Sequence, residues 1–234
     1  MEYLRFLILV LLISASTQTT SFAQDNPVDF EKAYGLDPVL YNGRIYSYFV
    51  PPGTEGTQFF TGQDFLSGTA KIRGILFKDL LLNYDVYNQQ LILEYYPEDG
   101  VRKLIVVSDA WLEEFNLGKM HFELLAISGT EKRIYQVIEN DTYRILYSWR
   151  KDLLLNNKHG ATNHVFSDPS KESYLRVKNQ FVKFGNNKSF IALFDPDDRA
   201  TLKKYMHQRK INLKKASDKL IMELIEYCKA SGLR

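Results

Sequence analysis

The sequence is poor in cysteine, and this limits how the protein can be stabilised. Its 234 residues contain one cysteine, Cys228. No internal disulfide can therefore form in any compartment, and stability has to come from burial of apolar surface. Cys228 falls on the apolar stripe of the last predicted helix, so we interpret it as a buried thiol and not as a nucleophile.

An excess of charge of one sign is also missing. Lys and Arg number 30 against 28 Asp and Glu, which leaves a formal net charge of +2. Such a balanced surface gives no attraction of the whole protein to nucleic acid. We expect no nucleic-acid partner.

Sequence motifs of common enzyme classes are absent. The chain has neither a serine in a Gly-flanked elbow nor a Gly-rich loop of the kind that holds phosphates. We therefore assign no catalytic and no cofactor-binding residues and expect no cofactor. The sequence favours a protein that is not an enzyme.

No apolar run approaches the roughly 20 residues that cross a bilayer as a helix. The run Phe6–Ile13 has 8 residues, follows Arg5, and precedes a Ser- and Thr-rich stretch that ends at Ala23. This layout is typical of a cleavable secretory signal. We predict that residues 1–23 are a signal peptide, that the mature chain has no transmembrane segment, and that it is secreted to the periplasm or cell envelope.

The body of the chain has the pattern of a β-rich protein. It contains 15 Tyr, 15 Phe and 2 Trp, and aromatic side chains suit strands. Strands are predicted at residues 44–50, 68–73, 76–84, 89–95, 103–107, 119–125, 133–138 and 143–150, with weaker ones at 174–177, 180–184 and 189–193. The connections are too short for crossover helices, so neighbouring strands should be antiparallel. Residues 156–169 are predicted to be a loop.

The C-terminal segment changes to a helical pattern. Asp195 is predicted to cap a helix with Pro196 at its first position, and this helix should run to Gln208. A second helix should begin near Ser217 and end at Gly232.

The predicted fold class is α+β: a mainly antiparallel β meander, forming a sandwich or a partly open barrel, with a two-helix C-terminal segment. Residues 24–129 form an antiparallel β region. Residues 130–234 form a β-hairpin region with the C-terminal helices, either as a second domain or within one domain with the first region.

One loop carries residues that could bind a metal. His159, His164 and Asp168 could hold a zinc ion if residues 156–169 folded them together. This gives the alternative function, a metal-assisted hydrolase. Ordinary loop residues are the simpler interpretation, because the spacing is not that of a helix face.

Two further features indicate binding surfaces. A basic run could bind an anionic partner, such as lipid head groups or a phosphorylated glycan, or it could simply be a solvated helix face. Exposed aromatic rings, for instance Tyr46 and Tyr48, could stack on a glycan, although alternating Tyr residues more often pack in a core. The basic residues concerned are Lys203, Lys204, Arg209, Lys210, Lys214 and Lys215.

Two segments carry a resemblance to known proteins. Residues 68–74 read Gly-Thr-Ala-Lys-Ile-Arg-Gly, and residues 82–92 read Leu-Asn-Tyr-Asp-Val-Tyr-Asn-Gln-Gln-Leu-Ile. With the Lys-rich helical tail at 202–227, the chain resembles uncharacterised exported periplasmic or envelope proteins of Gram-negative bacteria of the Bacteroidetes type. The resemblance implies an envelope location and no particular activity. We therefore expect an exported, non-catalytic binding or assembly module whose partner is an envelope protein, a glycan or an anionic lipid surface.

Overall fold

The computed structural model describes residues 39–97, 100–127, 129–158 and 161–233. The chain divides into two units, Met1–Asp37 and Pro38–Arg234. The predicted signal peptide, residues 1–23, lies outside the described residues. Of the helices that the structure describes, none combines the length and the apolar character needed to cross a membrane.

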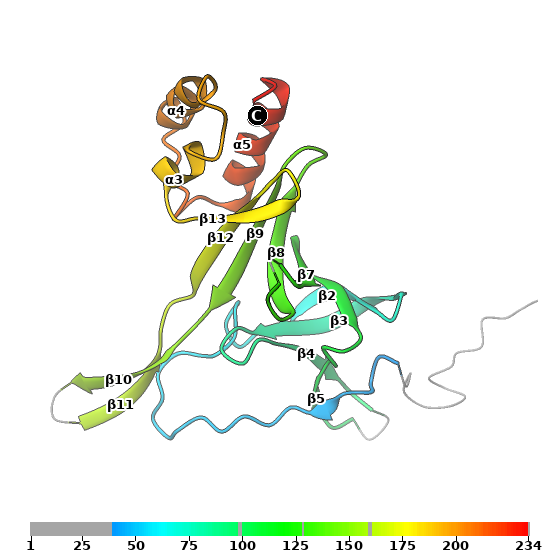
Figure 1. The fold of residues 1–234 in the computed structure, drawn as a ribbon. Helices are drawn as coiled ribbons and strands as arrows, with labels where there is room; N and C mark the ends of the chain where they lie inside the picture. The colour runs from blue at the N-terminus through cyan, green and yellow to red at the C-terminus, as the bar shows by residue number, and fades with distance from the viewer. Residues whose placement is uncertain (1–38, 98–99, 128, 159–160, 234) are drawn as a thin grey trace, which may run out of the picture. The chain divides into compact units, whose positions relative to one another are not determined.

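Eleven strands form one antiparallel sheet in the order β1-β5-β4-β3-β2-β6-β7-β8-β9-β12-β13 (Figure 1). This confirms the predicted α+β class with mainly antiparallel strands. The hairpin predicted at 133–138 and 143–150 is present as the β8–β9 pair. The strands are β1 (Arg44–Ile45), β2 (Leu66–Ile72), β3 (Ile75–Asp85), β4 (Gln90–Tyr95), β5 (Lys103–Val106), β6 (Leu112–Leu117), β7 (Met120–Leu125), β8 (Arg133–Glu139), β9 (Arg144–Arg150), β12 (Ser170–Val177) and β13 (Gln180–Phe184).

The sheet consists of two meanders joined at the β2–β6 pair. Strands β2 to β5 extend in one direction and end at β1, whereas strands β6 to β9, β12 and β13 extend in the other. Gly68 lies at the join, where an added Cβ would come within 2.0 Å of the Asn116 carbonyl oxygen. Only glycine allows β2 and β6 to approach so closely at this position. Strands β7 and β8, on the two sides of Gly129, are direct neighbours in the sheet.

Strand β6 was not predicted, and a bulge explains why. The β2–β6 register shifts between Lys71 and Ile72, so that Lys71 pairs with Glu114 but Ile72 pairs with Leu112. Glu113 is the extra residue. Because the bulge places the buried side chains of Leu112 and Phe115 three positions apart, the alternation that reveals a strand is lost.

The two largest hydrophobic cores lie along this sheet. The aromatic core gathers side chains from β2 to β8, with Phe115 and Phe122 stacked at 4.8 Å between ring centroids. The helical core gathers side chains from β8, β9, β12 and β13 and from three helices, with Phe190 and Leu224 fully buried. Trp149 packs against both cores.

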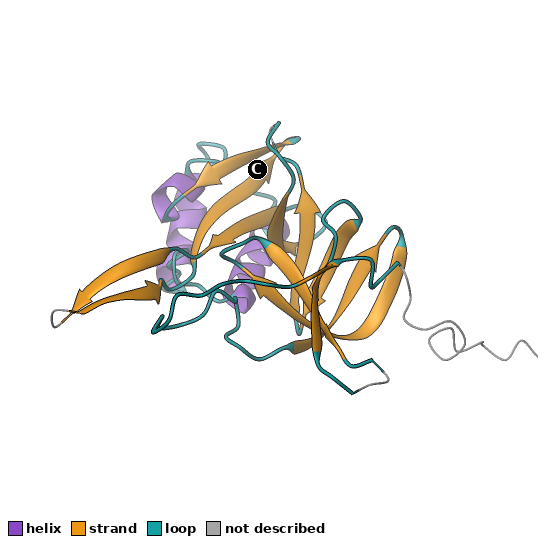
Figure 2. Ribbon diagram, turned by 90° about the horizontal axis from the view of Figure 1, so that it is seen from below, coloured by secondary structure: helices purple, strands orange, loops and turns teal. Residues whose placement is uncertain are grey.

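The helices cover one face of the C-terminal strands (Figure 2). They are α3 (Asn187–Ile191), α4 (Arg199–Gln208) and α5 (Asp218–Ala230). Ser217 caps α5 as predicted, because its hydroxyl accepts a hydrogen bond from the Leu220 N–H. Gly232 follows α5 with a φ of 63°, the conformation in which glycine ends a helix.

The predicted start of α4 was wrong. Asp195 and Pro196 lie in a turn, closed by the Asp198 N–H to the Asp195 carbonyl at 3.0 Å, and the helix begins at Arg199. The N-cap residue is Asp198, whose side chain makes no capping hydrogen bond. The sequence pattern predicted that Asp195 caps the helix. In the structure its carbonyl instead accepts from the Asp198 N–H within this turn.

Three other predicted elements differ from the structure. Residues 156–169 are not a loop, because β10 (Leu153–Lys158) and β11 (Ala161–Phe166) form a separate two-stranded sheet that projects from the main one (Figure 2). Its Leu154 and Leu155 are 49% and 65% exposed, although Phe166 is buried, so most of this hairpin lacks the buried apolar face by which strands are recognised. Residues 189–193 are not a strand, since α3 occupies most of them. In the predicted strand 44–50, only Arg44–Ile45 pairs with another strand.

Candidate functional site

A groove with a volume of about 770 Å³ lies between α3 and α4. Its apolar lining comes from Ile191, Met206 and Ile211, and its polar lining includes Lys188, Lys203, His207 and Lys210. Ligand sites for small molecules have volumes of about 300–1,000 Å³ and are mostly apolar with a few polar groups. The groove has these properties.

A capping box sets the position of α3 directly after β13. The Ser189 N–H donates to Asn186 Oδ1 at 2.9 Å, and the Asn186 N–H donates to Ser189 Oγ at 3.1 Å. This reciprocal pair satisfies two backbone donors at the start of the short helix. It therefore fixes where Lys188 and Ile191 enter the groove.

Asn187 connects α3 to the segment that follows α4. Its Nδ2 donates to the Ile211 carbonyl at 2.6 Å, and its Oδ1 accepts from the Leu213 N–H at 3.0 Å. Because one amide side chain bonds both backbone groups, the two walls of the groove are held together by a single residue.

The C-terminus of α4 ends in a Schellman motif with an unusual residue. The Ile211 N–H donates to the Met206 carbonyl at 2.9 Å, and the Lys210 N–H donates to the His207 carbonyl at 3.1 Å. Lys210 occupies the left-handed position with a φ of 51°, where glycine is strongly preferred. A lysine there costs about 1 kcal/mol in conformational energy.

The lysines of the groove have no acidic partner. Among the described residues, no carboxylate lies within ion-pair distance of Lys188, Lys203 or Lys210, whereas the neighbouring Arg209 pairs with Glu223 of α5 at 2.5 Å. The groove therefore combines an apolar lining with uncompensated positive charge.

The six basic residues predicted to bind an anionic partner are separated by the fold. Lys203 and Lys210 line the groove, and Arg209 is held by its ion pair. Lys204 and Lys215 are exposed outside the groove. Lys214 lines a different hollow. The sequence pattern missed Lys188, which lies next to a segment that was predicted as a strand.

The hollow beside Lys214 contains a second cation that the sequence did not reveal. It has a volume of about 380 Å³ and is also lined by Lys171 and Trp149. The Lys171 ammonium lies 3.6 Å from the ring centroid of Tyr147, within the range of a cation–π interaction. Burial lowers the pKa of Lys171, because it removes water from the ammonium group.

The three residues of the predicted zinc loop have different positions. His159 lies outside the described residues. His164 is on β11, and Asp168 follows the end of that strand and is exposed. Each residue of an extended chain adds about 3.3 Å, so His164 and Asp168 are separated along the chain. Zinc binding by these three residues stays a prediction.

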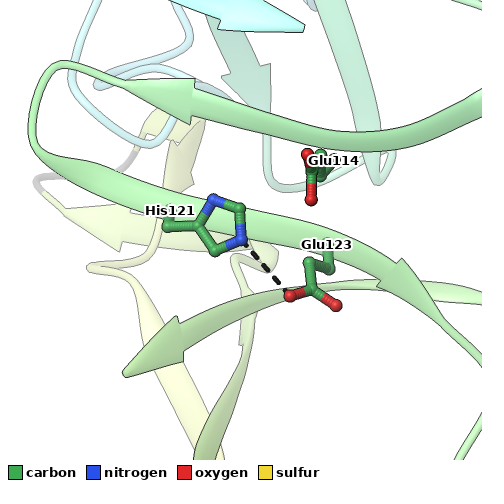
Figure 3. Close-up of side chains that lie close together, drawn as sticks. All are labelled: Glu114, His121 and Glu123. Atoms are coloured by element: carbon green, nitrogen blue, oxygen red, sulfur yellow. Dashed lines mark hydrogen bonds and ion pairs between the residues drawn. The ribbon is translucent and has the colours of Figure 1, made fainter. Parts of the chain in front are cut away.

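Within the part of the chain that the structure describes, the side chains that could hold a metal together are Glu114, His121 and Glu123 (Figure 3). Glu114 is on β6, and the other two are on β7. His121 Nε2 lies 3.3 Å from Glu123 Oε1. This contact raises the pKa of His121 and lowers that of Glu123, because each charge stabilises the other. Sequence patterns did not reveal the cluster, since it depends on the β6–β7 register.

The tyrosines considered for glycan stacking are in contact with other side chains. The Tyr46 hydroxyl donates to Asp85 Oδ2 at 2.7 Å and accepts from Gln58 Nε2 at 2.9 Å. The Tyr48 ring lies 5.8 Å from that of Tyr87. Both tyrosines are partly buried.

Cys228 is buried, as the sequence predicted. Burial raises the pKa of its thiol to about 12, because the thiolate would lose its hydration. The thiol is therefore protonated at neutral pH.

Comparison with known proteins found no matching family model, no matching curated protein and no matching solved structure.

Proposed function

We propose that this protein is an exported, non-catalytic binding module of the cell envelope, and that its groove between α3 and α4 takes an anionic amphiphile. Such a ligand has an apolar chain and one acidic head group. The groove carries this proposal, because Ile191, Met206 and Ile211 offer an apolar lining beside lysines that have no acidic partner among the described residues. The N-terminal pattern at residues 1–23 supports the export.

Both parts of the ligand would gain free energy in the groove. Burial of an apolar chain gives about 0.8 kcal/mol per methylene. Each lysine near an anionic head group adds about 1 kcal/mol at moderate ionic strength. The strained conformation of Lys210 supports the same conclusion, since unfavourable backbone conformations tend to be kept at binding sites.

Calorimetric titration with dodecyl phosphate, below its micellar concentration, tests the proposal. We expect one ligand per chain, and binding that weakens as salt is raised because charges contribute to it. Dodecyl maltoside, which has a similar chain and no charge, should bind at least about 10-fold more weakly, since two or three ammonium contacts are lost.

Two matched variants locate the site. The double variant Lys188→Gln/Lys203→Gln should weaken dodecyl phosphate binding by about 10-fold or more. The double variant Lys204→Gln/Lys215→Gln removes the same charge outside the groove and should leave the affinity within about 2-fold, because exposed charges at a distance are screened. Equal weakening in both variants, or no binding to the unmodified protein, would disprove the groove as the site.

The cellular part of the proposal has its own test. Fractionation should place the protein in the periplasm or envelope, with an N-terminus at Gln24. Intact Met1 on a cytosolic protein would contradict export and leave the ligand experiment unaffected.

A further inference from the structure

Glu114, His121 and Glu123 form a cluster whose two carboxylates face each other across neighbouring strands. Glu114 of β6 pairs directly with Glu123 of β7 in the sheet register. Like charges at directly opposite positions destabilise a sheet. Lys71 is the residue of β2 that pairs with Glu114, but its ammonium pairs with Glu113 at 3.2 Å. No Lys or Arg of the described chain lies within ion-pair distance of the Glu114 carboxylate.

Arg144 of β9 compensates only part of this charge. Its Nη2 lies 2.5 Å from Glu123 Oε1, and its Nε lies 3.3 Å from Glu139 Oε2. Both nitrogens are buried, yet neither makes an aligned hydrogen bond. One arginine therefore faces two glutamates, and Glu114 adds a third negative charge. The positive charge of Arg144 does not balance these carboxylates.

A chain of hydrogen bonds sets the orientation of the His121 ring. Asn116 Nδ2 donates to Thr69 Oγ1 at 2.9 Å, which turns Asn116 Oδ1 toward His121 Nδ1 at 3.0 Å. Nδ1 therefore carries a proton and donates it to the amide oxygen. In the neutral ring, the lone pair of Nε2 then points at the Glu123 carboxylate. Two lone pairs face each other there unless a second ring proton or a metal ion lies between them.

The distances within the cluster fit a metal ion. His121 Nε2 and Glu123 Oε1 are 3.3 Å apart, which is long for a charge-assisted hydrogen bond of about 2.7–2.9 Å. Two ligand atoms bound to zinc at about 2.0–2.1 Å with tetrahedral geometry are about 3.3 Å apart. One ligand atom from each of the three residues lies within 4.8 Å of the others.

We propose that Glu114, His121 and Glu123 bind one Zn²⁺ ion at the β6–β7 pair (Figure 3). Histidine nitrogen and carboxylate oxygen are both zinc ligands, and three protein ligands leave a fourth position for water. His121 also lines a pocket of about 370 Å³. Asn116 orients the histidine from outside the ligand set, as outer partners of metal-bound histidines do.

Zinc binding by the EDTA-treated protein, measured by equilibrium dialysis and metal analysis, tests the proposal. We expect one Zn²⁺ per chain and no comparable binding of Mg²⁺, which disfavours imidazole. His121→Gln should weaken binding by at least about 100-fold, and Asn116→Ala by about 10-fold, since loss of an outer partner has the smaller effect. Glu131→Gln, which alters an exposed carboxylate between β7 and β8, is the control and should bind zinc as the unmodified protein does.

The melting temperature separates a lost ligand from a lost fold. Without zinc, Glu114→Gln should melt at the same or a higher temperature than the unmodified protein, because the repulsion with Glu123 is relieved. With zinc, the unmodified protein should gain stability and this variant should gain little. An equal zinc-induced shift in both proteins would overturn the proposal. Loss of binding in His164→Gln and not in His121→Gln would also overturn it, in favour of the β10–β11 hairpin.

Discussion

The aromatic and helical cores of this protein are closed in different ways. The aromatic core is enclosed by strands β2 to β8 of one sheet, and its stacked rings of Phe115 and Phe122 come from adjacent strands. The helical core is enclosed because α3, α4 and α5 cover the strands. Both cores pack on one sheet, but strands enclose the aromatic core and helices cover the helical core.

This difference determines where each candidate site lies. The groove is formed by α3, α4 and the segment after α4, so it depends on how helices pack. The metal cluster of Glu114, His121 and Glu123 is formed by β6 and β7, with Arg144 from β9, so it depends on strand register. The binding groove and the metal cluster should therefore respond to different substitutions.

Loss of a large aromatic side chain from each core should give the largest effect. Phe122→Ala and Phe190→Ala each remove a fully buried ring and should lower the free energy of unfolding by about 3–5 kcal/mol. Phe122→Ala should leave dodecyl phosphate binding within about 2-fold, whereas Phe190→Ala, in α3, should weaken it by about 10-fold. Urea unfolding and calorimetry measure both quantities. A loss of binding in both variants would show that the cores act as one.

Trp149 is the residue through which the two cores should be coupled. Its Nε1 donates to Gln136 Oε1 at 2.8 Å, and Gln136 Nε2 donates to Asp218 of α5 at 2.6 Å. Trp149→Phe keeps a ring and leaves the Gln136 oxygen without its donor, which should cost about 1–3 kcal/mol.

Hydrogen exchange is the measurement for Trp149→Phe. Protection should fall in α5 as well as in β8 and β9 if this contact transmits stability between the cores. Trp111→Phe, which alters the other tryptophan, is the control. A uniform loss of protection in both variants would contradict a specific coupling.

Lys210→Gly should have a smaller effect of opposite sign on stability. Glycine relieves the left-handed strain at φ 51° and should raise the free energy of unfolding by up to about 1 kcal/mol. The variant should also bind dodecyl phosphate about 5-fold more weakly, because one ammonium group is lost. Lys178→Gly relieves a similar φ of 49° in the β12–β13 turn and should leave ligand affinity unchanged. Equal affinity in both variants would remove the functional explanation for Lys210.

The smallest expected effect is a pH-dependent change in stability at Glu94 of β4. The Glu94 carboxylate accepts from Arg102 at 2.7 Å and from the Tyr96 hydroxyl at 2.8 Å. Arg102 lowers the pKa of Glu94, because it stabilises the charged form. Glu94→Gln should cost less than about 1 kcal/mol at neutral pH. The cost is present above the ordinary pKa of about 4.3 and disappears as the pH falls through the lowered pKa.

Urea unfolding between about pH 3 and pH 7 measures this dependence. Glu131→Gln, which alters an exposed carboxylate outside this ion pair, should show no corresponding change. A cost of Glu94→Gln that stays constant over the whole range would contradict the assigned cause.

The sequence predicted most of the sheet and the C-terminal helices. Alternating apolar residues located β9, the turn at residues 139–141 located its hairpin with β8, and Ser217 located the start of α5. These signals are local: they depend on neighbouring residues and on period. The prediction failed at β6, because the Glu113 bulge breaks the period. It also failed at α3, because this helix has five residues and its local signal is a capping box.

Such local signals predicted fewer of the candidate-site residues. The basic run revealed Lys203 and Lys210, but not that Arg209 is neutralised by Glu223. Lys188 belongs to another helix, and its place in the groove depends on the Asn187 side chain. The zinc cluster joins residues on two strands that look like ordinary strand surface.

The sequence by itself determined the balance of charge, the lack of disulfides, the antiparallel strands and two helices. These properties follow from composition and from short-range periodicity. Only the tertiary structure decided which lysines share a groove and which carboxylates face His121. The physical reason is that both arrangements depend on register and packing between segments, which local preferences do not specify.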